Sequence, residues 1–254
     1  MSRPSTVLIT GCSSGFGLET ARFFLDQGWR VVATMRTPRE DLLPRSEALR
    51  VLPLDVTDAA SIRQCLGDAG PIDALVNNAG VGLLSPLEAV DMANARALYE
   101  TNVLGTIAMT QAVLPQFRER RAGVIVNVTS SVTLKSLPLL SVYTGSKAAV
   151  NAFTESLALE LEPFGIRARL VLPGRSPSTR FGDNARKLMS DSVPEAYTDF
   201  RDRVFAAVRD LSTPVTEAQD VAQAVWRAVT DPAAPMRMPA GADAVALAEA
   251  LAAA

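Results

Sequence analysis

Apolar residues along the chain form short runs that alternate with longer stretches of helical spacing. The short runs have the length of buried strands and cover residues 7–9, 30–35, 48–54, 74–76, 124–128, 167–172 and 236–238. The helical stretches cover residues 18–27, 88–120, 143–161, 217–229 and 242–254, and a shorter helix, capped by Thr57 or Asp58, runs to about Leu66. This alternation predicts an α/β fold: a doubly wound, Rossmann-type domain with a parallel sheet of about seven strands and helices on both faces.

The first apolar run leads into a glycine-rich turn, Thr10-Gly11-Cys12-Ser13-Ser14-Gly15-Phe16-Gly17. A strand that stops at a sharp turn and restarts as a helix aims unpaired backbone N–H groups and the positive end of the helix dipole at one point. We therefore expect the turn to bind phosphate, with glycine needed for the backbone conformation, the approach of a pyrophosphate or helix packing. A plain strand-to-helix connection is the alternative.

The regular alternation breaks between Gly174 and Pro214, where charged residues are mixed with aromatic ones. Ligands of doubly wound sheets bind beyond the carboxyl ends of the strands, so an insertion at that end predicts a substrate lid at about residues 175–213. Surface helices with a charged face are the alternative. Since the sequence contains neither repeats nor a linker, we expect residues 1–254 to form one domain.

Charge and composition exclude several kinds of partner. The 254 residues include 25 Lys and Arg against 27 Asp and Glu, a formal net charge of −2, which predicts no nucleic-acid or polybasic membrane surface. No apolar stretch reaches the roughly 18 residues of a membrane helix, and no signal-peptide core follows Met1, so we expect a cytoplasmic protein that binds a small molecule. The two cysteines, Cys12 and Cys65, suit a reducing compartment. Because histidine is absent, acid–base chemistry falls to Tyr, Lys, Asp, Glu or Cys, and no metal site is expected.

Tyr143 and Lys147 have a spacing that suits acid–base chemistry. They stand at i and i+4 near the start of a predicted helix, so their side chains share one face. A nearby cation favours the ionised phenol and is expected to lower the pKa of Tyr143 from about 10 toward working pH. The tyrosine would then serve as general acid for a ketone and general base for an alcohol. An ordinary tyrosine beside a solvated lysine is the alternative.

Several motifs in one order and spacing resemble the short-chain dehydrogenase/reductase family. They are Thr10-Gly11-x-x-x-Gly15-x-Gly17, Asn77-Asn78-Ala79-Gly80, Asn102, Ser130 and Tyr143-x-x-x-Lys147, and the likeness covers about residues 5 to 174. The N-terminal part resembles members that act on hydroxysteroids, retinoids and similar apolar ketones.

The resemblance implies a role for each residue of a catalytic set. Tyr143 would exchange the proton, Ser130 would bind the substrate oxygen, Lys147 would hold the nicotinamide ribose and lower the tyrosine pKa, and Asn102 would support a proton-relay water. Ser131 is a neighbouring rival, but Ser130 stands at the family's usual separation, thirteen residues before the tyrosine. Without the resemblance, Asn102 reads as a polar residue that bonds to backbone inside a helix.

Cofactor preference depends on the end of the second strand. Met35 stands where an acidic residue would accept hydrogen bonds from the ribose hydroxyls of NAD, and Arg36 follows it. An arginine fork suits the 2′-phosphate of NADP, and no carboxylate competes in this stretch, so we expect NADP(H), with NAD as second choice and a solvated loop cation as the alternative role. Many NADP-dependent relatives also carry a basic residue where this chain has Ser14.

The resemblance extends the cofactor contacts along the chain. Asp55 is expected to receive the adenine amino group, and Ser178 and Thr179 are alternatives for holding the nicotinamide carboxamide. The expected cofactor-binding residues are Gly11, Ser13, Ser14, Gly15, Phe16, Gly17, Arg36, Asp55, Val56, Asn78, Ala79, Gly80, Tyr143, Lys147, Pro173 and Gly174.

These observations predict an NADP(H)-dependent oxidoreductase that transfers hydride between nicotinamide and a carbonyl or secondary alcohol. Leu83, Leu84, Leu137 and Leu139 fit an apolar substrate, and core packing explains them equally well. A non-catalytic NAD(P)-sensing protein of the same fold is the alternative, and a sugar-nucleotide epimerase is a third possibility that would need a longer C-terminal region. Family analogy implies a homodimer or homotetramer packed through the helices at 88–120 and 143–161.

Overall fold

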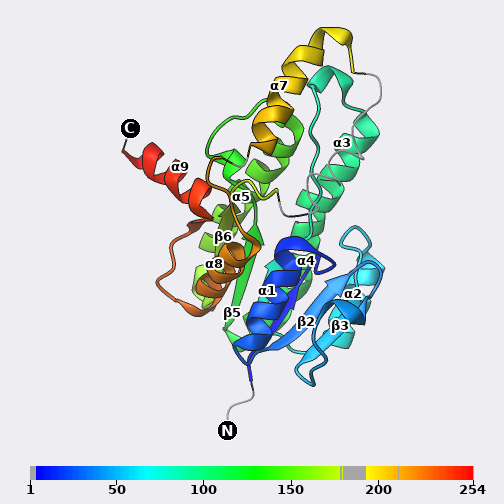
Figure 1. Ribbon diagram of the computed structural model, residues 1–254. Helices are drawn as coiled ribbons and strands as arrows, with labels where there is room; N and C mark the ends of the chain where they lie inside the picture. Colours follow the sequence, from blue (N-terminus) through cyan, green and yellow to red (C-terminus); the bar gives the residue numbers. More distant parts are fainter. Residues whose placement is uncertain (1–3, 178, 180–192, 211, 254) are drawn as a thin grey trace.

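The computed structural model describes residues 4–177, 179, 193–210 and 212–253 (Figure 1). Its centre is a seven-stranded sheet in the order β3-β2-β1-β4-β5-β6-β7, and every neighbouring pair is parallel. The strands are β1 Thr6–Ile9, β2 Arg30–Met35, β3 Leu49–Pro53, β4 Ala74–Asn77, β5 Gly123–Val128, β6 Ile166–Pro173 and β7 Arg237–Ala240. The predicted doubly wound parallel sheet is thus confirmed. The strand order reverses between β1 and β4, which is the point where such sheets bind ligands.

Helices cover both faces of the sheet (Figure 1). Their bounds are α1 Gly15–Asp26, α2 Ala59–Ala69, α3 Met92–Tyr99, α4 Gly105–Arg120, α5 Ser141–Leu161, α7 Thr198–Arg209, α8 Ala218–Thr230 and α9 Ala242–Ala252. Successive residues of a strand point to opposite faces, and β1 shows the result. Val7 and Ile9 pack in a core that includes Phe24 of α1, whereas Leu8 packs in a second core against α4 and α5.

Aromatic packing joins α1 to α8 on one face. The rings of Phe24 and Trp226 lie with centroids 5.1 Å apart and nearly perpendicular, and Trp29 lies 5.3 Å from Phe24. Such edge-to-face pairs add about 0.5–1.5 kcal/mol to the burial of the rings. This packing fixes α1, and therefore the glycine turn at its start, against the sheet.

The helical stretch expected at 88–120 is interrupted in the structure. Leu87–Ala89 form only a 3₁₀ turn, and α3 begins after Asp91, whose carboxylate accepts a hydrogen bond from the N–H of Ala93 at 2.8 Å. A π-helical segment, Glu100–Leu104, then separates α3 from α4. Apolar spacing continues through both interruptions, so periodicity alone did not reveal them. The π segment moves Asn102 out of regular helical register beside the loop that follows β4.

The segment expected as a lid begins after β6. The described parts of residues 175–213 include a 3₁₀ turn and α7, which Figure 1 shows projecting above the sheet near α3. Ser178 and most of the charged and aromatic residues that motivated the lid prediction, from 180 to 192, lie outside the described residues, so the lid stays a prediction. Within the described chain, no helix is both long and apolar enough to cross a membrane.

Candidate active site

The glycine turn brings the start of α1 to the carboxyl end of the sheet. Gly11 has a φ of +75°, which a side chain would strain, and its added Cβ would lie 2.8 Å from the Cα of Ala79. Gly17 faces the turn so closely that a Cβ there would overlap the Asn78 amide and the Gly11 carbonyl. Ser14 is the N-cap of α1 and makes no capping bond with its side chain. The first N–H groups of α1 are therefore available to an anion.

Thr10 and Asn78 connect the glycine turn to the loop after β4. The Thr10 hydroxyl accepts hydrogen bonds from the N–H groups of Asn78 and Ala79, at 3.0 and 2.9 Å. The Asn78 amide donates to the Thr10 and Gly11 carbonyls at 2.9 and 3.2 Å. Asn78 therefore has a structural role in shaping the turn, and Thr10, absent from the predicted site residues, supports it. The position of Thr10 directly before Gly11 was the available sequence signal.

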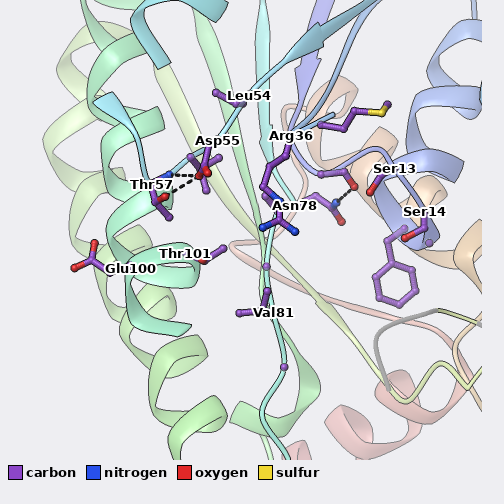
Figure 2. Close-up of a pocket in the computed structure, with 18 of the residues that line it drawn as sticks. Ser13, Ser14, Arg36, Leu54, Asp55, Thr57, Asn78, Val81, Glu100 and Thr101 are labelled. Carbon is purple, nitrogen blue, oxygen red and sulfur yellow. Dashed lines mark hydrogen bonds between the residues drawn. The ribbon is translucent and has the colours of Figure 1, made fainter. Parts of the chain in front are cut away.

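A cavity of about 660 Å³ opens beside this turn. Figure 2 shows the serines of the turn, Arg36, Asn78 and the residues around Asp55 on its walls. The predicted residues that line it are Gly11, Ser13, Ser14, Gly15, Phe16, Arg36, Asp55, Val56, Asn78, Ala79 and Gly80. The lining also contains Thr179, one of the two alternatives for the carboxamide, and residues that were not predicted, namely Met35, Leu54, Thr57, Val81, Gly82, Ala97, Glu100 and Thr101. The other residues of the predicted site are described by the structure but lie outside this lining: Gly17, Asn102, Ser130, Tyr143, Lys147, Pro173 and Gly174.

Arg36 and Asp55 stand on the same part of the cavity wall. Arg36 follows β2 and extends into the cavity between Asp55 and the serines of the turn (Figure 2). The Asp55 carboxylate accepts hydrogen bonds from the N–H and hydroxyl of Thr57, at 2.9 and 2.7 Å, and these bonds, more than the charge of Arg36, lower its pKa. The stretch around Arg36 holds no competing carboxylate of its own, but the fold brings the charge of Arg36 near Asp55, which follows β3.

The predicted catalytic residues Ser130, Tyr143 and Lys147 lie together where β5 ends and α5 begins. The side chains of Ser130 and Tyr143 are hydrogen-bonded, and the Lys147 ammonium lies 5.8 Å from the centroid of the Tyr143 ring. All three are buried, and Lys147 donates to the Val128 carbonyl at 3.0 Å. The i, i+4 spacing thus places a cation near the phenol as expected, and β5 supplies its anchoring carbonyl.

Burial reverses the expected direction of the tyrosine pKa. The free-energy cost of removing the phenolate from water exceeds the stabilisation by the hydrogen bond from Ser130. The pKa of Tyr143 is therefore raised above its ordinary value of 10. Burial also lowers the pKa of Lys147 from 10.5 to about 8, because desolvation disfavours the ammonium. The prediction that the pKa of Tyr143 falls toward working pH is therefore wrong for this structure, because burial outweighs the groups that favour the phenolate. The phenol is neutral and holds its proton.

Asn102 lies in the π-helical segment, with its side chain turned toward the loop after β4. Its amide oxygen accepts a bond from the Val81 N–H at 2.8 Å, and its nitrogen donates to the Val81 carbonyl and the Ser146 hydroxyl at 2.9 and 3.1 Å. An added Cβ at Gly80 would lie 3.2 Å from this amide oxygen and 3.4 Å from Nζ of Lys147. The side chain therefore has the backbone-bonding role weighed above, and the proton-relay role stays a prediction.

The end of β6 lies beside Ser130. The N–H of Thr129 donates to the Val171 carbonyl at 2.8 Å, which places Pro173 and Gly174 at the same sheet edge as the buried serine and tyrosine. Thr179, one of the two alternatives for the carboxamide, lines the cavity, with its side chain 3.5 Å from a Cβ built on Gly15. Among the described residues, no group of three or more Cys, Asp or Glu is arranged to hold a metal ion.

The parallel sheet, the glycine turn at its switch point and the buried Ser–Tyr–Lys cluster define a dinucleotide-binding α/β enzyme fold. The sequence model of the short chain dehydrogenase family matches residues 5–188. The chain belongs to this family, as the motifs predicted, and it is an oxidoreductase of the class that acts on CH–OH and C=O groups.

Relatives with assigned names agree with this membership. The chain is 38% identical to retinol dehydrogenase 8 of Bos taurus over 253 residues, which covers 92% of this chain and 80% of that protein. It is also 38% identical to the 3-ketodihydrosphingosine reductase of Bacteroides thetaiotaomicron, over 78% of this chain and 73% of that protein. With estradiol 17-beta-dehydrogenase 1 of Rattus norvegicus the identity is 37%, over 85% of this chain and 67% of that protein.

Solved structures share the fold over nearly the whole chain. A short-chain dehydrogenase from Streptomyces avermitilis superposes with a TM-score of 0.83 at 29% identity, covering 100% of this chain and 93% of that one. A serine dehydrogenase complexed with NADP⁺ gives a TM-score of 0.79 at 29% identity, over 93% and 94% of the two chains. A 3-ketoacyl-(acyl-carrier-protein) reductase from Brucella melitensis, complexed with NADH, gives 0.75 at 26%, over 92% and 96%. Neighbours of this fold therefore bind either nicotinamide cofactor.

Proposed function

We propose that this protein is an NADP(H)-dependent reductase or dehydrogenase that interconverts an apolar ketone and the corresponding secondary alcohol. The observation that supports this most directly is the buried cluster in which the Tyr143 phenol is hydrogen-bonded to Ser130 and lies near the Lys147 ammonium. A general acid, a donor to the substrate oxygen and a cation are the groups that carbonyl reduction needs from the protein.

The cavity beside the glycine turn fits a dinucleotide. Its walls combine the N-terminus of α1, hydroxyls of the turn, the Arg36 guanidinium and the half-buried Asp55. Gly11, Gly15, Gly80 and Gly82 also line it. In this proposal Ser13, Ser14, Gly15 and Phe16 lie along the pyrophosphate, and Asp55 and Val56 lie at the adenine. When bound, the nicotinamide supplies or accepts the hydride.

The preference for NADP(H) rests on Arg36. It lines the cavity at the end of β2, where a planar fork of donors can hold a ribose 2′-phosphate by paired, charge-assisted hydrogen bonds. The nearby Asp55 carboxylate accepts two hydrogen bonds from Thr57, and in this proposal it lies at the adenine and not at the 2′-phosphate. We therefore assign the 2′-phosphate to Arg36 and keep NAD as the second choice.

The protonated Tyr143 phenol is the form that ketone reduction needs. A neutral phenol at working pH carries the proton that the substrate oxygen takes up as hydride reaches the carbon, while Ser130 donates to the same oxygen. A protonated Lys147 stabilises the phenolate that remains, which offsets part of the cost of burial. In the alcohol-oxidising direction the Tyr143 phenol would first have to lose its proton, and burial of the phenol disfavours this loss.

The apolar character of the substrate is supported by the names of the relatives, which include a retinol dehydrogenase and a 17-beta-dehydrogenase. Of the four leucines considered for this role, Leu83 and Leu139 are buried, and Leu83 packs with Leu98 and Tyr143, so core packing explains them. Leu137 is 43% exposed and Leu84 is half-buried, and these two are the candidates for substrate contact.

We also propose that the protein acts in the cytoplasm as a homodimer or homotetramer. Leu104 and Leu159, on the helices that family analogy assigns to the interface, are 50% and 72% exposed in the single chain. Sedimentation at several concentrations tests the assembly, and a monomer at every concentration would contradict it.

The function is tested by titrating purified protein with NADPH and with NADH, followed by fluorescence, and by adding a panel of apolar ketones to each complex. Tight NADPH binding with oxidation by at least one ketone is the expected result. Tight binding without turnover on any ketone or alcohol would instead favour the NAD(P)-sensing protein. Absence of binding would overturn the interpretation of the glycine turn.

A further inference from the structure

Three segments far apart in the sequence meet at the turn that follows β6. The N–H of Gly174 donates to the Thr216 hydroxyl at 2.9 Å, and the N–H of Arg175 donates to Oδ2 of Asp243 at 2.7 Å. The Thr216 hydroxyl lies 2.6 Å from Oδ1 of Asp243 and 3.0 Å from the Ala240 carbonyl. Asp243, in the first turn of α9, therefore accepts a hydrogen bond from the Arg175 N–H and contacts the Thr216 hydroxyl. That hydroxyl in turn accepts from the N–H of Gly174.

The half-buried Asp243 and its partner Thr216 leave no room for side chains at the two neighbouring glycines. A side chain at Gly174 would overlap the Asp243 carboxylate, and one at Gly241, whose φ is +95°, would overlap Thr216. Thr216 itself is fully buried. The two glycines are thus required by the carboxylate and the hydroxyl, and the group is held by packing as well as by hydrogen bonds.

Arg175 extends the same group across the base of the segment between β6 and α8. Its guanidinium donates to the Asp210 carbonyl and the Thr213 hydroxyl, at 2.6 and 2.7 Å, and its carbonyl accepts from the N–H of Thr216 at 2.8 Å. The turn held by Asp243 is therefore fixed on both sides. The Arg175 side chain connects it to Asp210 and Thr213, and β6 connects it to the end of the sheet where Ser130 lies.

We propose that Asp243, acting through Thr216, is a positioning residue that holds the Pro173–Gly174–Arg175 turn against the nicotinamide half of the cofactor. This inference rests on the proposed function, because it assumes that the turn contacts the nicotinamide. Neither Asp243 nor Thr216 lines the cavity where the adenosine half is proposed to bind. Their loss should therefore weaken binding of the whole cofactor and slow hydride transfer, and leave binding of the adenosine half unchanged.

The chemistry explains why aspartate stands at this position. Both carboxylate oxygens accept hydrogen bonds, from two different donors. Asparagine has nearly the same shape but no charge. With its one acceptor oxygen on the Arg175 N–H, its NH₂ group meets the Thr216 hydroxyl, which must then give its proton to the Ala240 carbonyl. Asp243→Asn thus replaces two charge-assisted bonds by neutral ones, with little change in volume.

The experiment compares four variants with the wild type: Asp243→Asn, Thr216→Val, Thr216→Ser and, as a control, Asp231→Asn. The Asp231 carboxylate likewise accepts a hydrogen bond from a backbone N–H, that of Ala233, at 2.9 Å. The Asp231 carbonyl, however, accepts from Arg167 near the amino end of β6, far from the carboxyl ends of the strands. For each protein, the Kd values of NADPH and of adenosine 2′,5′-bisphosphate are measured, together with kcat for a ketone that the wild type reduces.

We expect Asp243→Asn and Thr216→Val to weaken NADPH binding and lower kcat by about tenfold, because charge-assisted hydrogen bonds are weakened or lost. The Kd of adenosine 2′,5′-bisphosphate should stay at the wild-type value, because that ligand lacks the nicotinamide half. Thr216→Ser, which keeps the hydroxyl, and the control should behave as the wild type. A general loss of folding would instead weaken both ligands together, and that result would overturn the positioning role.

Failure of the proposal can be told apart from failure of the proposed function. If the wild type binds NADPH and reduces a ketone but Asp243→Asn does both equally well, the positioning role is wrong and the function stands. If the wild type binds neither NADPH nor adenosine 2′,5′-bisphosphate, the proposed function is wrong and the role of Asp243 is overturned with it.

Discussion

Lys147 is buried within hydrogen-bonding distance of the Val128 carbonyl, 3.0 Å away, and its pKa is lowered to about 8. The same burial raises the pKa of the neighbouring Tyr143. The free protein thus holds a neutral phenol and an ammonium that loses its proton at mildly alkaline pH. Titration of Lys147, rather than of the tyrosine, is expected to dominate the behaviour of this site between pH 7 and 9.5.

The free energy of unfolding of the free protein should rise with pH in this range. Between pH 8 and 10.5 the unfolded chain keeps the Lys147 proton while the folded chain has lost it, so the unfolded state binds more protons and stability increases with pH. The rise attributable to Lys147 should be about 2 kcal/mol from pH 7 to 9.5. Urea unfolding of the wild type and of Lys147→Met, at both pH values, measures the difference; an equal pH dependence in the two proteins would contradict it.

Replacing Tyr143 by phenylalanine should lower kcat by about 10²–10⁴-fold, the range that general acid catalysis contributes. NADPH binding should change little, because the fold and the cavity lining remain. The matched control is Tyr99→Phe, which removes the hydroxyl of a partly exposed tyrosine on α3. A Tyr143→Phe protein with near-normal turnover would refute the proton-donor role.

Arg36→Asp should weaken NADPH binding by about 100-fold and NADH binding far less, because the charge-assisted bonds to the 2′-phosphate are lost and a like charge replaces them. Arg45→Asp makes the same charge change at an exposed arginine that is outside the cavity lining. Fluorescence titration of the three proteins with both cofactors measures the ratio. Equal losses for NADPH and NADH would show that Arg36 does not bind the 2′-phosphate.

Gly17→Ala and Gly67→Ala should have opposite effects on stability. A Cβ at Gly17 meets the Gly11 carbonyl and the Asn78 amide, so the turn must shift, at a cost of about 1–3 kcal/mol. A Cβ at Gly67, inside α2, meets nothing within 4 Å and should stabilise the protein by about 0.5–1 kcal/mol. Thermal unfolding of both variants checks the signs, and a Gly17→Ala protein as stable as Gly67→Ala would rule out the tight packing of the turn.

The sequence alone determined the order of the seven strands along the chain, the parallel sheet, the glycine turn and the i, i+4 spacing of Tyr143 and Lys147. These features are recorded locally, in periodicity, turn residues and short spacings. Ser130, which the family resemblance singled out, forms a hydrogen bond with Tyr143 in the structure. The catalytic and cofactor roles of these residues stay predictions until the variants are measured.

Only the tertiary structure decided how those residues are surrounded. Burial, which depends on the whole fold, outweighed the local Tyr–Lys pairing and raised the tyrosine pKa. The interruption near Asp91 and the π-helical segment around Asn102 left the apolar spacing unchanged, so periodicity missed them. Asp243 lies 68 residues beyond Arg175, and their contact exists because β7 pairs with β6 and carries the start of α9 to the end of that strand. Local patterns record which element a residue joins, whereas solvation and long-range contacts arise only when the elements pack.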